Sequence, residues 1–220
     1  VGSEMCIRDR VMLGHVRYGT YGKNSIDYVQ PVMRQNNWMH RNLILAGNFN
    51  MSNNDELFES LVKLGQHPKE KSDTITIMEK IGHFLDSEVS LIYDTLKGGG
   101  YSKEEMPPII EDKLNIVKIL KNSSKNWDGG YVIAGMLGHG DSFILRDPSG
   151  IRPAFYMENN EVVVVASERP AIQTVFNVSY QKIKEIPRGN VLIINKKGKI
   201  ELTQILEQKT NKACSFERIY

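Results

Sequence analysis

The pattern of apolar and polar positions separates a helical first half of the chain from a second half made of strands. Apolar residues three and four positions apart indicate amphipathic helices, and short β-branched runs bounded by turn residues indicate strands. Helices are predicted at 52–65, at 72–86, in a further segment before the glycines at 98–100, from about 107 to 120, and at 168–176. Strands are predicted at 11–16, 43–47, 131–137, 142–146, 154–157, 161–167 and 191–195.

The expected helix ends carry ordinary start and stop signals. Ser52 or Asn53 can cap the first helix, and Gly65 ends it. Ser72 can cap the second, while the GGG at 98–100 reads as a surface loop rather than a domain boundary. Strands, helices and then strands again predict an α+β layered domain.

Composition excludes several classes of function. The 220 residues carry 28 Lys and Arg against 26 Asp and Glu, a net charge of +2 without basic clusters, so nucleic acid is not an expected partner. Apolar runs such as 162–166 are far too short to cross a bilayer, so no membrane is expected either. Two widely separated cysteines make no disulfide framework, and the cytoplasm is the expected compartment.

The first candidate for chemistry is GHVRYGTYG at 14–22, where His15, Arg17, Tyr18 and Thr20 stand close together. Arg17 could fork two hydrogen bonds onto a carboxylate, and Thr20 could add a hydroxyl donor. The alternative is that His15 and Tyr18 are core or edge residues and that Arg17 forms a structural ion pair. The motif alone leaves both interpretations open.

Three further segments have both a functional and a structural interpretation. Asn48 is expected to leave a strand just before a helix, where its amide could donate to an oxyanion or simply shape a turn. Asp73, next to the cap Ser72, could bind a substrate ammonium or merely favour the helix N-terminus. In RDPSGIRP at 146–153 the charged residues could contact an anion, but a rigid structural loop is favoured.

The order and spacing of six segments resemble the class II glutamine amidotransferases. The segments are GHVRYGT at 14–20, AGNFNMSNNDEL at 46–57, SDT at 72–74, DGGYVIAGMLGHGDSFILRDPSGIRP at 128–153, VVASE at 164–168 and EIPRGNVLII at 185–194. RDPSGIRP is the most specific of them and is most similar to the glutaminase domain of amidophosphoribosyltransferases. CSFERIY at 214–220 resembles the segment that leads into their phosphoribosyltransferase domain.

The resemblance implies a fold and a domain organisation. The expected fold is the N-terminal-nucleophile hydrolase αββα sandwich, two antiparallel sheets between helix layers, incomplete at the N-terminus. Residues 1–10 are expected to be a non-native artefact, similar to a translated sequencing adapter, or a disordered tail. Residues 11–220 would then form a partial glutamine amidotransferase domain without the phosphoribosyltransferase domain.

The same resemblance implies roles for individual residues. Arg17 would bind the α-carboxylate of glutamine, with Tyr18 and Thr20 lining the pocket, and Asp73 would hold the α-ammonium. Asn48 would donate its amide to the oxyanion. Phe49 would contribute its backbone N–H where family members often have glycine, provided that its φ angle is tolerated.

The nucleophile of this family, an N-terminal cysteine, is predicted to be absent. Cys6 follows Met5 but continues as Ile-Arg-Asp rather than Gly-Ile or Gly-Val, and it lies too close to the GHVRY stretch. Its nitrogen is acylated, so it offers no free α-amino group as base. The chain as given is therefore expected to lack glutaminase activity.

The expected activity of the family is hydrolysis of glutamine, with ammonia passed to phosphoribosyl pyrophosphate to give 5-phosphoribosylamine in de novo purine synthesis. The expected parent protein is a homo-oligomer whose phosphoribosyltransferase domain uses Mg²⁺. No cofactor or metal is expected in this part, although Cys214 could be one ligand of an iron–sulfur cluster whose other ligands lie beyond residue 220. The alternatives are a glucosamine-6-phosphate synthase or asparagine synthetase type of amidotransferase, or a non-catalytic glutamine-binding module.

Overall fold

The computed structural model describes residues 11–16, 29–68 and 70–215. Its helices are α1 (Asn54–Lys63), α2 (Asp73–Gly98), α3 (Met106–Lys113), α4 (Ile116–Ser123), α5 (Arg169–Phe176) and the 3-10 helices η2 (Met39–Arg41) and η3 (Tyr180–Lys182). Its strands are β1 (Val32–Arg34), β2 (Leu43–Met51), β3 (Gly129–Leu137), β4 (Ser142–Arg146), β5 (Phe155–Glu158), β6 (Val163–Ala166), β7 (Lys184–Glu185), β8 (Asn190–Ile194) and β9 (Ile200–Gln204). Within this part of the chain, no helix combines the length and the hydropathy needed to span a bilayer.

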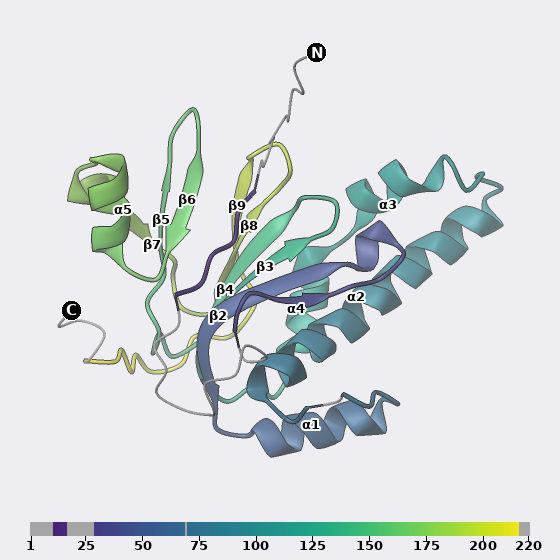
Figure 1. The fold of residues 1–220 in the computed structure, drawn as a ribbon, viewed down its shortest axis with the longest axis horizontal. Helices are drawn as coiled ribbons and strands as arrows, with labels where there is room; N and C mark the ends of the chain where they lie inside the picture. The colour runs from purple at the N-terminus through teal and green to yellow at the C-terminus, as the bar shows by residue number, and fades with distance from the viewer. Residues whose placement is uncertain (1–10, 17–28, 69, 216–220) are drawn as a thin grey trace, which may run out of the picture.

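The strands form two antiparallel sheets between helices, as expected from the sequence. The larger sheet has the order β1-β2-β3-β4-β8-β9 and the smaller one the order β6-β5-β7. Figure 1 shows α1 to α4 on one side of the larger sheet, with the smaller sheet and then α5 on its other side. This is the αββα arrangement of the N-terminal-nucleophile hydrolases.

Alternation along the strands builds a separate core on each face of the larger sheet. Tyr131 and Ile133 of β3 join the large cluster beneath α1 to α4, whereas Val132 faces the smaller sheet. A third cluster around Ile172 fixes α5 to the outer face of the smaller sheet. The helices and the smaller sheet therefore pack against opposite faces of β3.

Several boundaries differ from the predicted ones. Residues 11–16 form no strand: they pair with no strand of the described part of the chain, and Val16 is 99% exposed. The helix at 72–86 and the one after it are a single helix, α2. The helix predicted from about 107 to 120 is broken in two because Asn115 caps α4, its Oδ1 accepting the Lys118 N–H at 2.9 Å.

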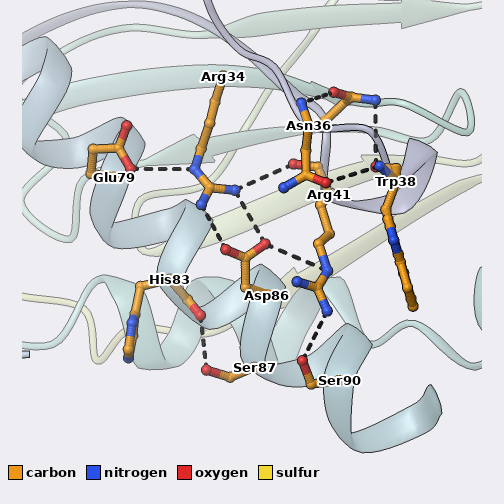
Figure 2. Close-up of polar contacts among 10 residues, drawn as sticks. Arg34, Asn36, Trp38, Arg41, Glu79, His83, Asp86, Ser87 and Ser90 are labelled. Atoms are coloured by element: carbon orange, nitrogen blue, oxygen red, sulfur yellow. Dashed lines mark hydrogen bonds and ion pairs between the residues drawn. The ribbon is translucent and has the colours of Figure 1, made fainter. Parts of the chain in front are cut away.

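An arginine on the edge strand ties the larger sheet to α2 (Figure 2). Arg34 of β1 forms a fork on Asp86, with Nη2–Oδ2 at 2.6 Å and Nη1–Oδ1 at 3.2 Å, and its Nε lies 3.3 Å from Glu79 Oε2. Burial by itself lowers the pKa of Arg34, but hydrogen bonds and charge from the two carboxylates outweigh it and raise the pKa. The Arg34 side chain is 16% exposed, so its attraction to the carboxylates is only partly screened by water.

The path of this side chain requires a glycine on the helix. A Cβ at Gly82 would lie 2.5 Å from Arg34 Nε and 2.6 Å from its Cδ. Next to this contact, Arg41 of η2 donates to Ser90 Oγ at 3.0 Å and stacks on Trp38. The connection between β1 and β2 is therefore held on α2 by Arg34 at its start and by Arg41 near its end (Figure 2).

A group of titratable side chains lies where η2 meets the β3–β4 and β8–β9 turns. His40 is 4% exposed, and its ring centroid lies 5.9 Å from that of His139. Asp141 lies 3.2 Å from His139 Nε2 and accepts the Lys196 backbone N–H at 2.8 Å, while the Lys196 ammonium pairs with Glu111. Burial lowers the pKa of His40 below its ordinary value, His139 lowers it further, and Glu111 opposes them.

Breaking the Arg34 clamp should destabilise the domain. We expect Arg34→Met to lower the free energy of unfolding by about 2 kcal/mol or more, because Asp86 and Glu79 lose the cation that compensates their partial burial. Equilibrium urea unfolding measures this. The control is Lys71→Met, which breaks the exposed Asp55–Lys71 pair and should cost no more than about 1 kcal/mol. Equal losses in the two variants would contradict a special role for Arg34.

Acidification should weaken the fold through His40. Because its folded pKa is lowered, the unfolded chain binds the proton more readily, and the free energy of unfolding falls as the pH drops below about 6.5. We expect His40→Leu to show a smaller loss of stability than the wild type between about pH 7.5 and pH 5.5. The same substitution at the exposed His67 is the control. An unchanged pH dependence in His40→Leu would show that His40 does not carry the effect.

Candidate functional site

The two predicted oxyanion residues lie inside β2 rather than after it. Asn48 pairs with Val132 and Phe49 with Tyr131, and β2 continues to Met51 before α1 begins. The apolar run ends at Gly47, but hydrogen bonding to β3 carries the strand through the polar residues that follow. The expectation that Asn48 leaves the strand was therefore wrong.

Pleating sends these two side chains to opposite faces of the sheet. Asn48 lies opposite Val132, whose side chain faces the smaller sheet, so Asn48 projects from that face and is exposed at its end. Phe49 packs against the core beneath the helices. A polar amide is thus presented between the two sheets while its neighbour anchors the strand.

The hydrogen-bond pattern gives the direction of the Phe49 backbone N–H. Ser52 N–H donates to Asp128 O, and Gly138 N–H donates to Asn42 O, so even-numbered residues of β2 form the hydrogen-bonded pairs with β3. The N–H of Phe49 therefore points to the other edge of β2, toward the side of β1. Among described residues other than glycine, positive φ angles occur only at Asn126 and Asn177, so Phe49 adopts this geometry without the backbone of a glycine.

Gly47, immediately before these residues, is required by close packing. A Cβ at this position would lie 2.3 Å from the backbone oxygen of Val132 and 2.9 Å from the Phe49 ring. Its N–H donates to Gln30 Oε1 at 2.7 Å. Any side chain here would push β2 away from β3 at the point that carries Asn48.

Asp73 is the first residue of α2, as the sequence indicated. Ser72 caps the helix by accepting the Ile75 N–H, and Asp73 Oδ1 accepts the Thr74 N–H at 2.9 Å. The carboxylate is half-buried at the positive end of the helix. The preceding Lys71 pairs with Asp55 at 3.0 Å, which joins the start of α2 to the start of α1.

Of the residues expected to form the pocket, the structure describes Asn48, Phe49 and Asp73. Figure 1 shows the end of β2 and the start of α2 at the same end of the larger sheet. Arg17, Tyr18, Thr20 and Cys6 lie outside the described residues. The roles given to Arg17, Tyr18, Thr20, Asn48, Phe49 and Asp73 stay predictions.

RDPSGIRP forms a rigid structural loop. The buried Asp147 accepts the backbone N–H groups of Ser149 at 2.9 Å, Ile151 at 3.1 Å and Arg152 at 3.1 Å. Arg146 donates to the carbonyls of Arg152 and Ile186 at 2.8 and 2.5 Å. The charged groups of Arg146 and Asp147 thus bond to backbone groups of the protein, which favours the structural interpretation of this segment.

An iron–sulfur cluster does not fit the described residues alone. Cys214 is a free thiol whose backbone N–H donates to Ile151 O at 3.2 Å. Clusters are held by several thiolates, and no group of three or more His, Cys, Asp or Glu in the described part of the chain could hold a metal ion.

Sequence reasoning missed the glutamine that contacts this strand. Gln30 lies between the GHVRYGTYG stretch and β1, and its amide oxygen accepts the Gly47 N–H. Neither β1 nor this contact follows from apolar periodicity, because β1 is three residues long. The signal that was present is the position of Gln30 immediately before Pro31, which cannot donate to a ladder.

The layered fold, with two antiparallel sheets between helices, places the chain among the N-terminal-nucleophile hydrolases. Comparison with curated proteins then relates it to the amidophosphoribosyltransferases over nearly all of its length. The enzymes from Pasteurella multocida and Methanothermobacter thermautotrophicus are 26% identical over 214 residues, covering 94% and 97% of this chain. The enzyme from Bacillus subtilis is 28% identical over 216 residues, covering 97%. No family model matches the chain.

Solved structures give the same relationship. The glutamine phosphoribosylpyrophosphate (PRPP) amidotransferase from B. subtilis, complexed with ADP and GMP, superposes with a TM-score of 0.66 at 26% identity over 94% of this chain and 37% of its own. An allosteric regulatory enzyme of purine biosynthesis superposes with a TM-score of 0.67 at 28% identity, with the same coverage. The chain is thus similar to amidophosphoribosyltransferases in sequence and in fold over nearly all of its length. It spans 38% of the length of each of the three curated relatives named above.

Adding a side chain at Gly47 should destabilise β2 at the position next to Asn48. We expect Gly47→Ala to lower the free energy of unfolding by about 2 kcal/mol, because the added methyl group meets backbone that cannot move independently of the sheet. Urea unfolding measures the loss. Gly98→Ala is the control, since a Cβ there meets nothing within 4 Å and a helix favours alanine. A neutral Gly47→Ala would contradict the packing described here.

Proposed function

We propose that this chain is the glutaminase domain of an amidophosphoribosyltransferase. In the whole protein, the domain would release ammonia from glutamine and pass it to phosphoribosyl pyrophosphate, giving 5-phosphoribosylamine for de novo purine synthesis. The similarity to amidophosphoribosyltransferases over 94–97% of the chain supports this assignment. The parent would be a cytoplasmic homo-oligomer, and Mg²⁺ would serve the phosphoribosyl transfer outside this domain.

The observation that carries the proposal is the pairing of two donors at one point of β2. The Asn48 amide projects from the face of the sheet that faces the smaller sheet, and the adjacent Phe49 N–H points out of the β1 edge. An oxygen atom placed above that edge can accept hydrogen bonds from both donors. Such a pair stabilises the negative charge that develops when an amide carbonyl is attacked.

Substrate binding follows from the charges of free glutamine. Its α-carboxylate requires a cation, which Arg17 would supply with bidentate geometry. Its α-ammonium requires an anion, which Asp73 would supply from the start of α2. The side-chain amide would then extend toward Asn48 and Phe49, so that only a molecule with both charges and an amide fills the site.

Hydrolysis needs a thiolate and a base in addition to these groups. In this reaction the α-amino group takes the proton of the thiol, the thiolate adds to the amide carbon, the proton passes to the leaving nitrogen, which departs as ammonia, and water then cleaves the thioester to glutamate. Cys6 has an acylated nitrogen and does not meet the second requirement. We therefore propose that the 220-residue polypeptide binds glutamine without hydrolysing it.

Binding and turnover should separate in this polypeptide. We expect L-glutamine to bind, as followed by calorimetry or by two-dimensional NMR of the amide groups, and we expect no release of glutamate from wild type or Cys6→Ala. Asp73→Asn should weaken binding about tenfold, because a neutral side chain no longer pairs with the ammonium.

The control for Asp73→Asn is Asp55→Asn, which removes an equivalent first-turn carboxylate from α1. It should leave the affinity for glutamine unchanged. Glutamate release that disappears in Cys6→Ala would overturn the rejection of Cys6. Absence of glutamine binding by the wild-type polypeptide, shown to be folded by its NMR spectrum, would overturn the proposed site.

A further inference from the structure

The β1–β2 ladder ends in an unusual way beside the proposed oxyanion donors. Val32 pairs with Leu45, so continuing the register by two residues places Gln30 opposite Gly47. In an unbroken ladder, the main-chain carbonyl of residue 30 would accept the Gly47 N–H. Instead the side-chain oxygen Oε1 of Gln30 accepts it, at 2.7 Å.

This exchange of acceptor has a geometric consequence. A side-chain amide reaches several ångströms beyond its own backbone, so the main chain at residue 30 can leave the strand edge while Gly47 keeps its hydrogen bond. The next N–H that points out of this edge belongs to Phe49. Gln30 therefore accepts the last N–H on this edge of β2 before the N–H of Phe49, the proposed oxyanion donor.

Gln30 is itself held in place from both directions. It is half-buried, and it precedes β1, whose last residue Arg34 is fixed to Asp86 and Glu79 of α2. Opposite it, Gly47 is held in the β2–β3 ladder, where it pairs with Ile133. The Gln30–Gly47 hydrogen bond thus joins two anchored segments.

We propose that Gln30 is a positioning residue, whose amide oxygen holds residues 47–49 so that Asn48 and the Phe49 N–H together face the carbonyl oxygen of bound glutamine. This role rests on the function proposed above. It requires an acceptor of this length at position 30 and does not require contact between Gln30 and the substrate.

The test compares two substitutions of similar length in the 220-residue chain. Gln30→Met removes the acceptor, whereas Gln30→Glu keeps an acceptor oxygen at the same reach. The readouts are the amide exchange rates and chemical shifts of Gly47 and Phe49, the affinity for L-glutamine, and the urea unfolding curve.

We expect Gln30→Met to speed exchange of the Gly47 amide, to reduce the shift of the Phe49 amide on glutamine addition, and to weaken glutamine binding about fivefold, the equivalent of one hydrogen bond. Gln30→Glu should restore all three readouts. The midpoint of urea unfolding should change little in either variant, because one partly exposed bond is a small part of the total stability.

Other results would overturn the proposal in distinguishable ways. Unchanged glutamine affinity and Phe49 shift in a folded Gln30→Met would show that Gln30 is only a strand contact, with the proposed function left standing. Loss of affinity matched by a general loss of stability, or no rescue by Gln30→Glu, would equally exclude positioning. If wild type does not bind glutamine, the proposed function fails, and an unchanged Phe49 amide exchange rate in Gln30→Met would separately show that Gln30 does not order this strand.

Discussion

The ion pairs between Arg34 and the carboxylates of α2 determine where the parts of the candidate site lie. β1 has three residues and could not hold its place at the sheet edge by ladder bonds alone. The fork on Asp86 and the bond to Glu79 fix it to the 26-residue helix whose first residue is Asp73. One side chain thus links the edge strand beside β2 to the helix whose start carries Asp73, in addition to the apolar core that β2 and α2 share.

β2 is in turn held in place on several sides where it carries Asn48. Its odd-numbered side chains are packed under the helices, its even-numbered residues are bonded to β3, and its outer edge is satisfied by β1 and Gln30. The helices therefore hold one face of β2, β3 holds one edge, and β1 with Gln30 holds the other edge. The side chain of Asn48 projects from the remaining face, the one on the side of the smaller sheet, where it is exposed.

The helices, most of the strands and the fold class could be predicted from the sequence because local periodicity carries them. α2 shows its cap at Ser72 and its apolar stripe directly, and the β-branched runs after residue 131 mark most of the later strands. The very short strands β1 and β7 and the largely exposed β9 could not be predicted this way, because pairing with neighbours rather than composition makes them strands. Residues 11–16 show the reverse: an apolar run that meets no partner strand among the described residues is not a strand.

The site could be predicted only where a side chain carries the chemistry. Asn48 and Asp73 are chemical groups that stand out in a sequence; Asp73 begins α2 as expected, whereas Asn48 lies inside β2 rather than after it. Gln30 could not be found, because its significance lies in a register that two segments form only after folding. The Arg34 contact has the same origin, since the absence of a Cβ at Gly82 matters only once β1 lies across α2.

Phe49 illustrates how the two parts of one residue can meet different structural requirements. Its ring belongs to the interior beneath the helices, filling the space above Gly47, while its N–H belongs to the strand edge. The space in the core therefore determines where the ring lies, and strand pairing determines the direction of the N–H. An aromatic residue here, where the resemblance of the sequence implies glycine, changes the packing without changing the direction of the N–H. A site built from main-chain atoms depends on backbone geometry, so the residue type at that position can change while the site is kept.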